Sequence, residues 1–256
     1  MKRILITLVS FISLSFCYVA SAQNNTQVAG DVYLVPNPKT ARWSYIETDG
    51  NGKQISTVFQ SIESMEGDGI NGCIKIRVEE VAVASPTDTV KNSMYYSFKD
   101  GEYMVNMQAM FEKDILGDFV DMALEEKKSE ISEEDRKKAI EEVKKHVNIS
   151  GETRGIPRYP QVGKLPDYTF SFKISIMNMK VLGQQRMIVG TEKVQTEAGT
   201  FDCFILEETI TTKAMMMKEV EKTKSWYAYG IGLVKEATYD KAGKLLSTMT
   251  LNKINW

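Results

Sequence analysis

Residues 168–256 contain no proline and alternate repeatedly between apolar and polar side chains, which restricts this segment to β structure. The clearest run has an apolar residue at every second position: Tyr168, Phe170, Phe172, Ile174 and Ile176. Because successive strand side chains point to opposite faces, the run predicts a strand with one buried and one solvated face. Proline cannot donate a ladder hydrogen bond, so its absence after Pro166 favours a sheet of paired strands.

Residues 31–110 form a second region with strand-like patterns. Its clearest alternation consists of three aliphatic residues: Ile74, Ile76 and Val78. Lys99-Asp100-Gly101-Glu102 contains the Asp-Gly pair that is typical of a two-residue hairpin. The segments 49–53 and 240–244 share the pattern Asp-x-x-Gly-Lys, which predicts two equivalent hairpin tips. The chain is therefore expected to be mainly β, with antiparallel pairing.

A helical insertion is predicted at about residues 111–147, between the two β regions. Phe111, Ile115 and Phe119 recur at helical spacing and indicate a helix with one apolar face. Ser132 followed by Asp135 resembles a capping box at the start of a highly charged second helix. Such a helix is usually solvated, and the alternative reading is an arm that binds a partner.

The first 22 residues have the pattern of a cleaved secretory signal peptide. Lys2-Arg3 is followed by an uncharged apolar stretch and by the small residues Ala20-Ser21-Ala22. The mature chain would be a single β-rich domain, residues 23–256, in the periplasm, on the cell surface or secreted. No other apolar run approaches the length of a membrane span, so no transmembrane segment is expected after cleavage.

Charge and cysteine content narrow the classes of partner. The formal net charge is -2, from 32 basic and 34 acidic residues, and this balance gives no footprint for nucleic acid or an anionic membrane. Cys73 and Cys203 remain after removal of the signal peptide, an even number in a compartment that permits disulfides. They either pair or are two buried thiols in different strands.

The sequence contains no convincing catalytic, cofactor-binding or metal-binding pattern. Residues 67–72 match Gly-x-Gly-x-x-Gly, but a strand-like segment follows where a dinucleotide site needs a helix, so a hairpin loop is expected. His146 is the only histidine, and it lies at the basic end of a polar helix, where it complements the helix dipole. The acidic pairs Glu79-Glu80 and Glu207-Glu208 resemble a hydrolase pair only in composition, because strand neighbours point to opposite faces.

Methionine is frequent, with 14 residues, and includes the run Met215-Met216-Met217. Methionine fills cores, lines apolar ligand surfaces or offers thioether ligands to Cu(I), and these readings stay open. If a curved sheet enclosed an apolar ligand such as a lipid tail, the residues expected to line the cavity are Phe170, Phe172, Met177, Met179 and Trp226.

The second half of the chain resembles a family of uncharacterised exported bacterial proteins, the TapB-like group. The resemblance covers about residues 155–256 and is carried by Tyr159-Pro160, Gly163, Leu165-Pro166-Asp167, Ala198-Gly199-Thr200-Phe201-Asp202-Cys203, Trp226-Tyr227-x-x-Gly230-x-Gly232-Leu233-Val234-Lys235 and Tyr239-Asp240-x-x-Gly243-Lys244-Leu245. It implies an antiparallel meander that forms a strongly curved sheet or a barrel-like structure, and an envelope or secretion-associated role. It implies no activity and no catalytic residues.

Three functions follow as hypotheses. The first is a non-enzymatic exported β protein of the bacterial envelope that acts as a scaffold or interaction module, with an envelope protein as its partner. The second is a periplasmic carrier of an apolar, lipid-like ligand. The third is an envelope hydrolase, which would need a polar cleft with convergent carboxylates.

Overall fold

The computed structural model describes residues 41–67, 72–99, 101–123, 132–174 and 177–255, and every statement about the structure refers to these. The predicted signal peptide lies outside the described residues, as do residues 68–71, Asp100 and Ile176. No helix in these ranges is both long enough and apolar enough to cross a membrane.

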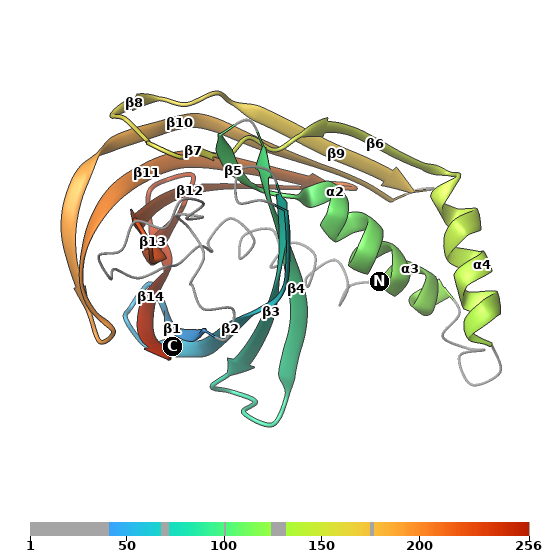
Figure 1. Cartoon of the computed structure of the whole chain (residues 1–256), viewed down its shortest axis with the longest axis horizontal. Helices are drawn as coiled ribbons and strands as arrows, with labels where there is room; N and C mark the ends of the chain where they lie inside the picture. Colours follow the sequence, from blue (N-terminus) through green and yellow to red (C-terminus); the bar gives the residue numbers. More distant parts are fainter. Residues whose placement is uncertain (1–40, 68–71, 100, 124–131, 175–176, 256) are drawn as a thin grey trace.

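The described strands form one antiparallel sheet that curls round on itself (Figure 1). The strands are β1 (Arg42–Asp49), β2 (Gln54–Gly67), β3 (Gly72–Ala82), β4 (Thr89–Lys99), β5 (Glu102–Val105), β6 (Val147–Glu152), β7 (Ile156–Pro157), β8 (Gly163–Lys164), β9 (Tyr168–Ile174), β10 (Met177–Thr196), β11 (Gly199–Ala214), β12 (Met217–Ala228), β13 (Gly232–Asp240) and β14 (Leu245–Asn255). Their order is β6-β9-β10-β11-β12-β13-β14-β1-β2-β3-β4-β5-β7, and β8 pairs with β10. The predicted fold class, mainly β with a strongly curved antiparallel sheet, is confirmed.

The two Asp-x-x-Gly-Lys segments form the same hairpin turn. In the β1–β2 turn the Asp49 carboxylate accepts hydrogen bonds from the backbone N–H groups of Asn51 and Lys53, both at 2.9 Å. In the β13–β14 turn Asp240 accepts from Ala242 at 2.8 Å and from Lys244 at 2.9 Å. Gly52 and Gly243 have φ of 82° and 87°, which glycine adopts without steric cost.

The helical insertion begins earlier and ends earlier than predicted. It consists of α2 (Met107–Met110), a π-helical turn (Phe111–Ile115), α3 (Leu116–Ala123) and α4 (Glu133–Lys144). Asn106 starts it by accepting a hydrogen bond from the Ala109 N–H at 2.8 Å, a capping role that the sequence analysis missed. Ser132 caps α4 as predicted. Val147, the last residue of the predicted helical insertion, instead begins the edge strand β6, which extends to Glu152.

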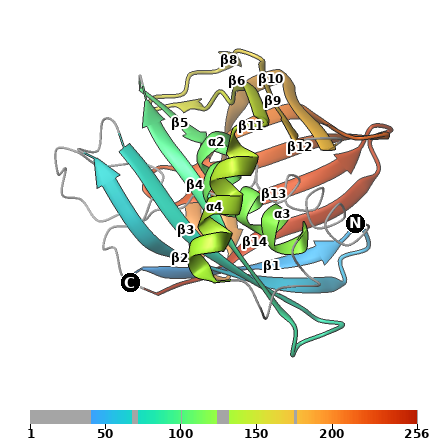
Figure 2. The same cartoon turned by 90° about the vertical axis from the view of Figure 1, so that its right-hand side faces the viewer.

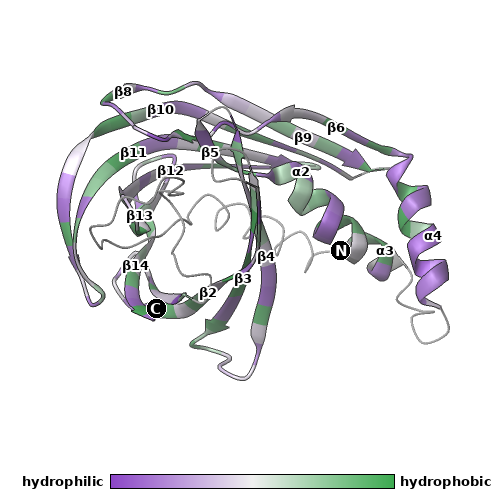
Figure 3. Cartoon of the chain, in the orientation of Figure 1, coloured by the Kyte–Doolittle hydropathy of each residue, from purple (hydrophilic) through white to green (hydrophobic). Residues whose placement is uncertain are grey.

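Two apolar clusters form the core. The larger one draws residues from β1 to β5 and from β10 to β14, including Trp43, Tyr45 and Leu251. The smaller one packs the helices against β9 to β11, with the rings of Phe111 and Phe172 centred 4.4 Å apart. Figure 2 shows the three helices grouped on one side of the curled sheet, and in Figure 3 α4 is mainly hydrophilic. No residue of α4 is buried, in agreement with the expectation of a solvated helix.

Candidate functional site

Residues 153–168, which we call the seam segment, run from edge strand β6 to the opposite edge strand β7 and back to β9. Edge strand β6 ends at Glu152, and the opposite edge strand β7 begins only four residues later, at Ile156. In β7, Ile156 pairs with Tyr103 of β5. Further along, Gly163 of β8 pairs with Ile188 of β10. The seam segment therefore bridges the gap between the two edges of the curled sheet.

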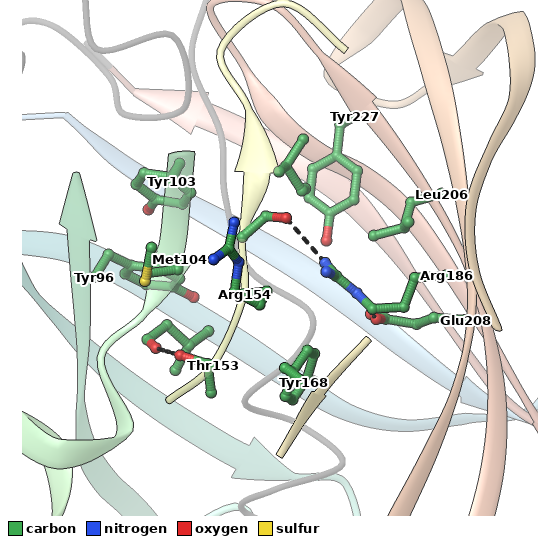
Figure 4. Close-up of a pocket in the computed structure, with 13 residues that line it drawn as sticks. Tyr96, Tyr103, Met104, Thr153, Arg154, Tyr168, Arg186, Leu206, Glu208 and Tyr227 are labelled. Carbon is green, nitrogen blue, oxygen red and sulfur yellow. Dashed lines mark hydrogen bonds and ion pairs between the residues drawn. The ribbon is translucent and has the colours of Figure 1, made fainter. Parts of the chain in front are cut away.

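Arg186 secures the seam segment from the β10 side. The register of β10 shifts between Gln184 and Met187, and Gln185 has a φ of 54°. Bulges of this kind re-aim a side chain, and here Arg186 is only 2% exposed. Its guanidinium donates to the Glu208 carboxylate at 2.9 Å and to the backbone carbonyl of Gly155 at 3.0 Å (Figure 4). It also donates to the backbone carbonyl of Pro166 at 2.8 Å.

Glu102 secures the same segment from the β5 side. Its carboxylate pairs with Arg154 at 2.6 Å and accepts the Gly155 N–H at 3.1 Å. The Thr153 hydroxyl donates to the backbone carbonyl of Val105. Both polar groups of the Gly155 backbone are thus bound by charged side chains that come from opposite halves of the sheet.

A small cavity lies between these two sets of contacts. Its volume is about 40 Å³. Four tyrosines, Tyr96, Tyr103, Tyr168 and Tyr227, share its lining with Arg154, Arg186 and Glu208. A cavity needs roughly 10–15 Å³ to hold one water, so this one has room for a few waters. Sites for drug-sized ligands occupy about 300–1,000 Å³, so this particular cavity is too small to enclose a lipid tail.

The cavity lacks an activated nucleophile. Burial raises the pKa of Tyr168 well above its usual value, and the negative charge of Glu208 raises it further, so the phenol stays protonated. The Glu208 carboxylate is engaged by Arg186, and the Thr153 hydroxyl is engaged by Val105. Nucleophilic catalysis needs a nucleophile within hydrogen-bonding reach of a base, and these lining groups do not form such a pair.

The residues predicted to line an apolar ligand cavity lie elsewhere. Phe170, Phe172 and Met179 are buried in the smaller cluster, beneath the helices. Trp226 belongs to the larger cluster, and its indole N–H donates to Glu192 at 2.7 Å. Met177 of β10 pairs with Ile174, and its side chain is outside the described part of the structure. None of the other four residues, Phe170, Phe172, Met179 and Trp226, lines the small cavity.

Cys73 and Cys203 are free thiols in the structure. Cys73, in β3, packs against the smaller cluster, whereas Cys203, in β11, belongs to the larger one. Burial raises the pKa of Cys203 to about 12, with a further contribution from the charge of Asp202. A thiol with so high a pKa is a poor nucleophile at neutral pH.

Three further sequence interpretations can be compared with the structure. Gly67 at the end of β2 pairs with Gly72 at the start of β3, so the glycine-rich motif is followed by a strand and not by a helix; its residues 68–71 lie outside the described residues. Glu208 is buried, whereas Glu207 pairs with Lys224 at 3.2 Å on the outer face, which confirms that the neighbouring acids diverge. His146 is exposed just after α4. No group of three or more His, Cys, Asp and Glu residues in the described ranges is placed to hold a metal ion.

Sequence reasoning missed Arg186, Glu102 and Arg154, and it considered Glu208 only as a member of the acidic pair Glu207-Glu208. A signal was present for Arg186, because the polar run 183–186 interrupts the strand pattern between Val181 and Ile188. A polar interruption inside a long strand is typical of a bulge. The partner of Arg186 lies 22 residues away, and no local pattern connects the two.

The comparisons with known proteins agree with this architecture. Residues 39–251 match the model of the DUF3108-like family. The chain belongs to the DUF3108-like family. The match extends well before residue 155, where the C-terminal resemblance to the TapB-like group begins, and that narrower assignment stays a prediction. No curated protein matches the sequence of this DUF3108-like chain.

Two solved structures share the fold of this DUF3108-like chain. One is a candidate lipoprotein from Parabacteroides distasonis, with 17% identity and a TM-score of 0.59, which covers 90% of this chain and 100% of that one. The other is a candidate exported protein with a YmcC-like fold from Bacteroides fragilis, with 16% identity and a TM-score of 0.59, covering 88% of this chain and 99% of that one. At these identities the likeness shows the fold alone.

Replacing Gly155 with alanine is expected to lower the free energy of unfolding by about 1–3 kcal/mol, the usual cost of forcing an extra carbon into a packed site. The new Cβ would lie 2.0 Å from the backbone oxygen of Tyr103, so either β5 or the seam segment must move. Thermal unfolding of the variant and the wild type measures the change. An unchanged melting temperature would show that the seam segment is not held tightly against β5.

Proposed function

We propose that this DUF3108-like protein is an exported, non-enzymatic module of the bacterial envelope that acts as a scaffold or interaction module. Export is supported by the predicted signal peptide and by the two similar structures, which are named as a candidate lipoprotein and a candidate exported protein. The predicted TapB-like resemblance adds an envelope or secretion-associated role. An envelope protein is the proposed class of partner.

One observation carries the non-enzymatic part of the proposal: the charged groups in and beside the cavity are bonded to other groups of the protein. Arg186 is bonded to Glu208 and to two carbonyls of the seam segment, and Glu102 is bonded to Arg154 and to the Gly155 N–H. Groups committed in this way hold the sheet edges together rather than bind a substrate. The cavity of about 40 Å³ is itself too small for a lipid tail, so a lipid carrier would have to use a different site.

Native mass spectrometry of the full chain, purified without detergent from the envelope of its own cells, tests the proposal. We expect the native mass to equal the denatured mass of a chain that starts at Gln23. An additional lipid mass that disappears on denaturation would favour the carrier. Repeating the measurement with Met216→Asp, which places a charge at the exposed turn between β11 and β12, shows whether a retained lipid lies at the surface or in the interior.

A further inference from the structure

The tip of the β11–β12 hairpin exposes three consecutive methionines. Met216 is 101% exposed, and Met215 and Met217 are 47% and 45% exposed. Ala214 pairs with Met217, so Met215 and Met216 form a two-residue turn. Such turns favour Asn-Gly because they need positive φ, and Met215 adopts a φ of 54°. The tip thus places apolar side chains in solvent at positions where small polar residues are favoured.

The tip is held in place by the neighbouring strand. The N–H of Met215 donates to the backbone carbonyl of Asn178 at 3.1 Å, and it also lies 3.1 Å from the side-chain oxygen of Asn178. Because Asn178 belongs to β10, the methionines project from one end of three paired strands, β10, β11 and β12. A fixed apolar projection of this kind presents the same surface to any partner.

A row of lysines crosses the sheet just behind the tip. Lys180 of β10 pairs with Lys213 of β11, which pairs in turn with Lys218 of β12. Residues that pair directly share a face, so the three ammonium groups lie on the same side of the sheet. All three side chains are exposed, and the ion pairs found among the described residues include none of them.

Directly opposed like charges destabilise a sheet, which makes the row costly to the isolated protein. Lys173, exposed on β9, adds a fourth positive charge near the tip, since it pairs with Asn178. The nearest acid on β12, Glu219, pairs with Thr212 and therefore lies on the other face. The surface behind the methionines is consequently basic, although the whole chain has a formal net charge of -2.

We propose that the β11–β12 tip docks on an anionic lipid bilayer, with Met215, Met216 and Met217 entering the interface and the lysine row contacting the headgroups. Apolar side chains beside a basic surface match the two layers of such a membrane, its acyl boundary and its negative headgroups. One tip gives weak, reversible binding that salt screens, because the charges act only over roughly 10 Å. The site uses no residue of the seam segment and does not depend on the proposed function.

Sedimentation of the full mature chain with vesicles tests the proposal. We expect binding to vesicles of phosphatidylcholine with phosphatidylglycerol, and at least about tenfold weaker binding to phosphatidylcholine alone. Met216→Asp and the triple change Lys180→Gln, Lys213→Gln, Lys218→Gln should each weaken binding to the anionic vesicles by roughly tenfold or more. Raising the salt concentration should reduce the binding of the wild type.

Matched controls separate the tip from general surface chemistry. Met187→Ser changes another exposed methionine, on β10, and Lys53→Gln, Lys241→Gln, Lys244→Gln together remove three exposed lysines from the other hairpin tips. Both controls should bind like the wild type. Circular dichroism of each variant confirms that it is folded. The proposal would be overturned if the wild type failed to bind anionic vesicles, or if the tip and control variants lost binding equally. Neither result would bear on the proposed function as an exported envelope module.

Discussion

Replacing Glu208 with alanine is expected to lower the free energy of unfolding by about 3–5 kcal/mol, the range found when one partner of a buried ion pair is removed. Arg186 and Glu208 are 2% and 7% exposed, and their charged atoms are 2.9 Å apart. Without the carboxylate, the Arg186 guanidinium keeps two carbonyl partners but remains a buried charge with no counterion. Equilibrium unfolding in urea measures the loss.

The neighbouring residue provides a matched control for this prediction. Glu207 pairs with Lys224 at 3.2 Å, and its side chain is 46% exposed. Exposed pairs contribute about 0–1 kcal/mol, so Glu207→Ala should change the stability little. If the two alanine variants unfolded at the same urea concentration, the account of Arg186 as the anchor of the seam segment would be wrong.

Glu221→Gln is expected to stabilise the protein by up to about 3 kcal/mol at pH 8, and to have little effect at pH 4. Glu221 is only 9% exposed. Burial raises its pKa from 4.5 to about 7, and the negative charge of Glu219 contributes in the same direction. Between these two values the folded chain binds more protons than the unfolded chain, so stability falls as the pH rises.

The measurement is a set of urea unfolding curves from pH 4 to pH 8 for the wild type and the variant. Burial also raises the pKa of Glu47 and Glu80, so the difference between the two proteins isolates the contribution of Glu221. Glu197→Gln, which removes an exposed carboxylate at the β10–β11 turn, should give a curve parallel to the wild type. A stability difference that does not change with pH would contradict the raised pKa.

The strands could be predicted because their side-chain pattern is local. The alternation from Tyr168 to Ile174 and from Ile74 to Val78 reflects a period of two that burial on one face imposes. The two Asp-x-x-Gly-Lys turns were also readable, since an Asx-type hydrogen bond and a positive φ depend on residues within one turn. The start of the helical insertion was missed because the Asn106 cap precedes the apolar stripe that marks the helix.

The seam and the lysine row could not be predicted, because both depend on distant strands. Glu102 and Arg154 are 52 positions apart, and Arg186 reaches the carbonyl of Gly155 across 31 positions. The lysine row joins Lys180 to Lys213 through strand register, which one sequence does not determine. The near-zero net charge of the whole chain suggested no affinity for an anionic membrane, but a total charge does not reveal a local cluster such as the lysine row.

Hydrogen–deuterium exchange across residues 153–168 tests most directly whether the seam segment is a fixed closure of the sheet. The N–H groups of Gly155, Arg158 and Leu165 are bonded to Glu102, Gly101 and Arg186 respectively. The account predicts that these amides in the wild type exchange as slowly as those of the central strand β11, and that Glu208→Ala accelerates them. Exchange in the wild type as fast as that of an exposed turn would contradict the account, because the segment would then not be fixed between the two sheet edges.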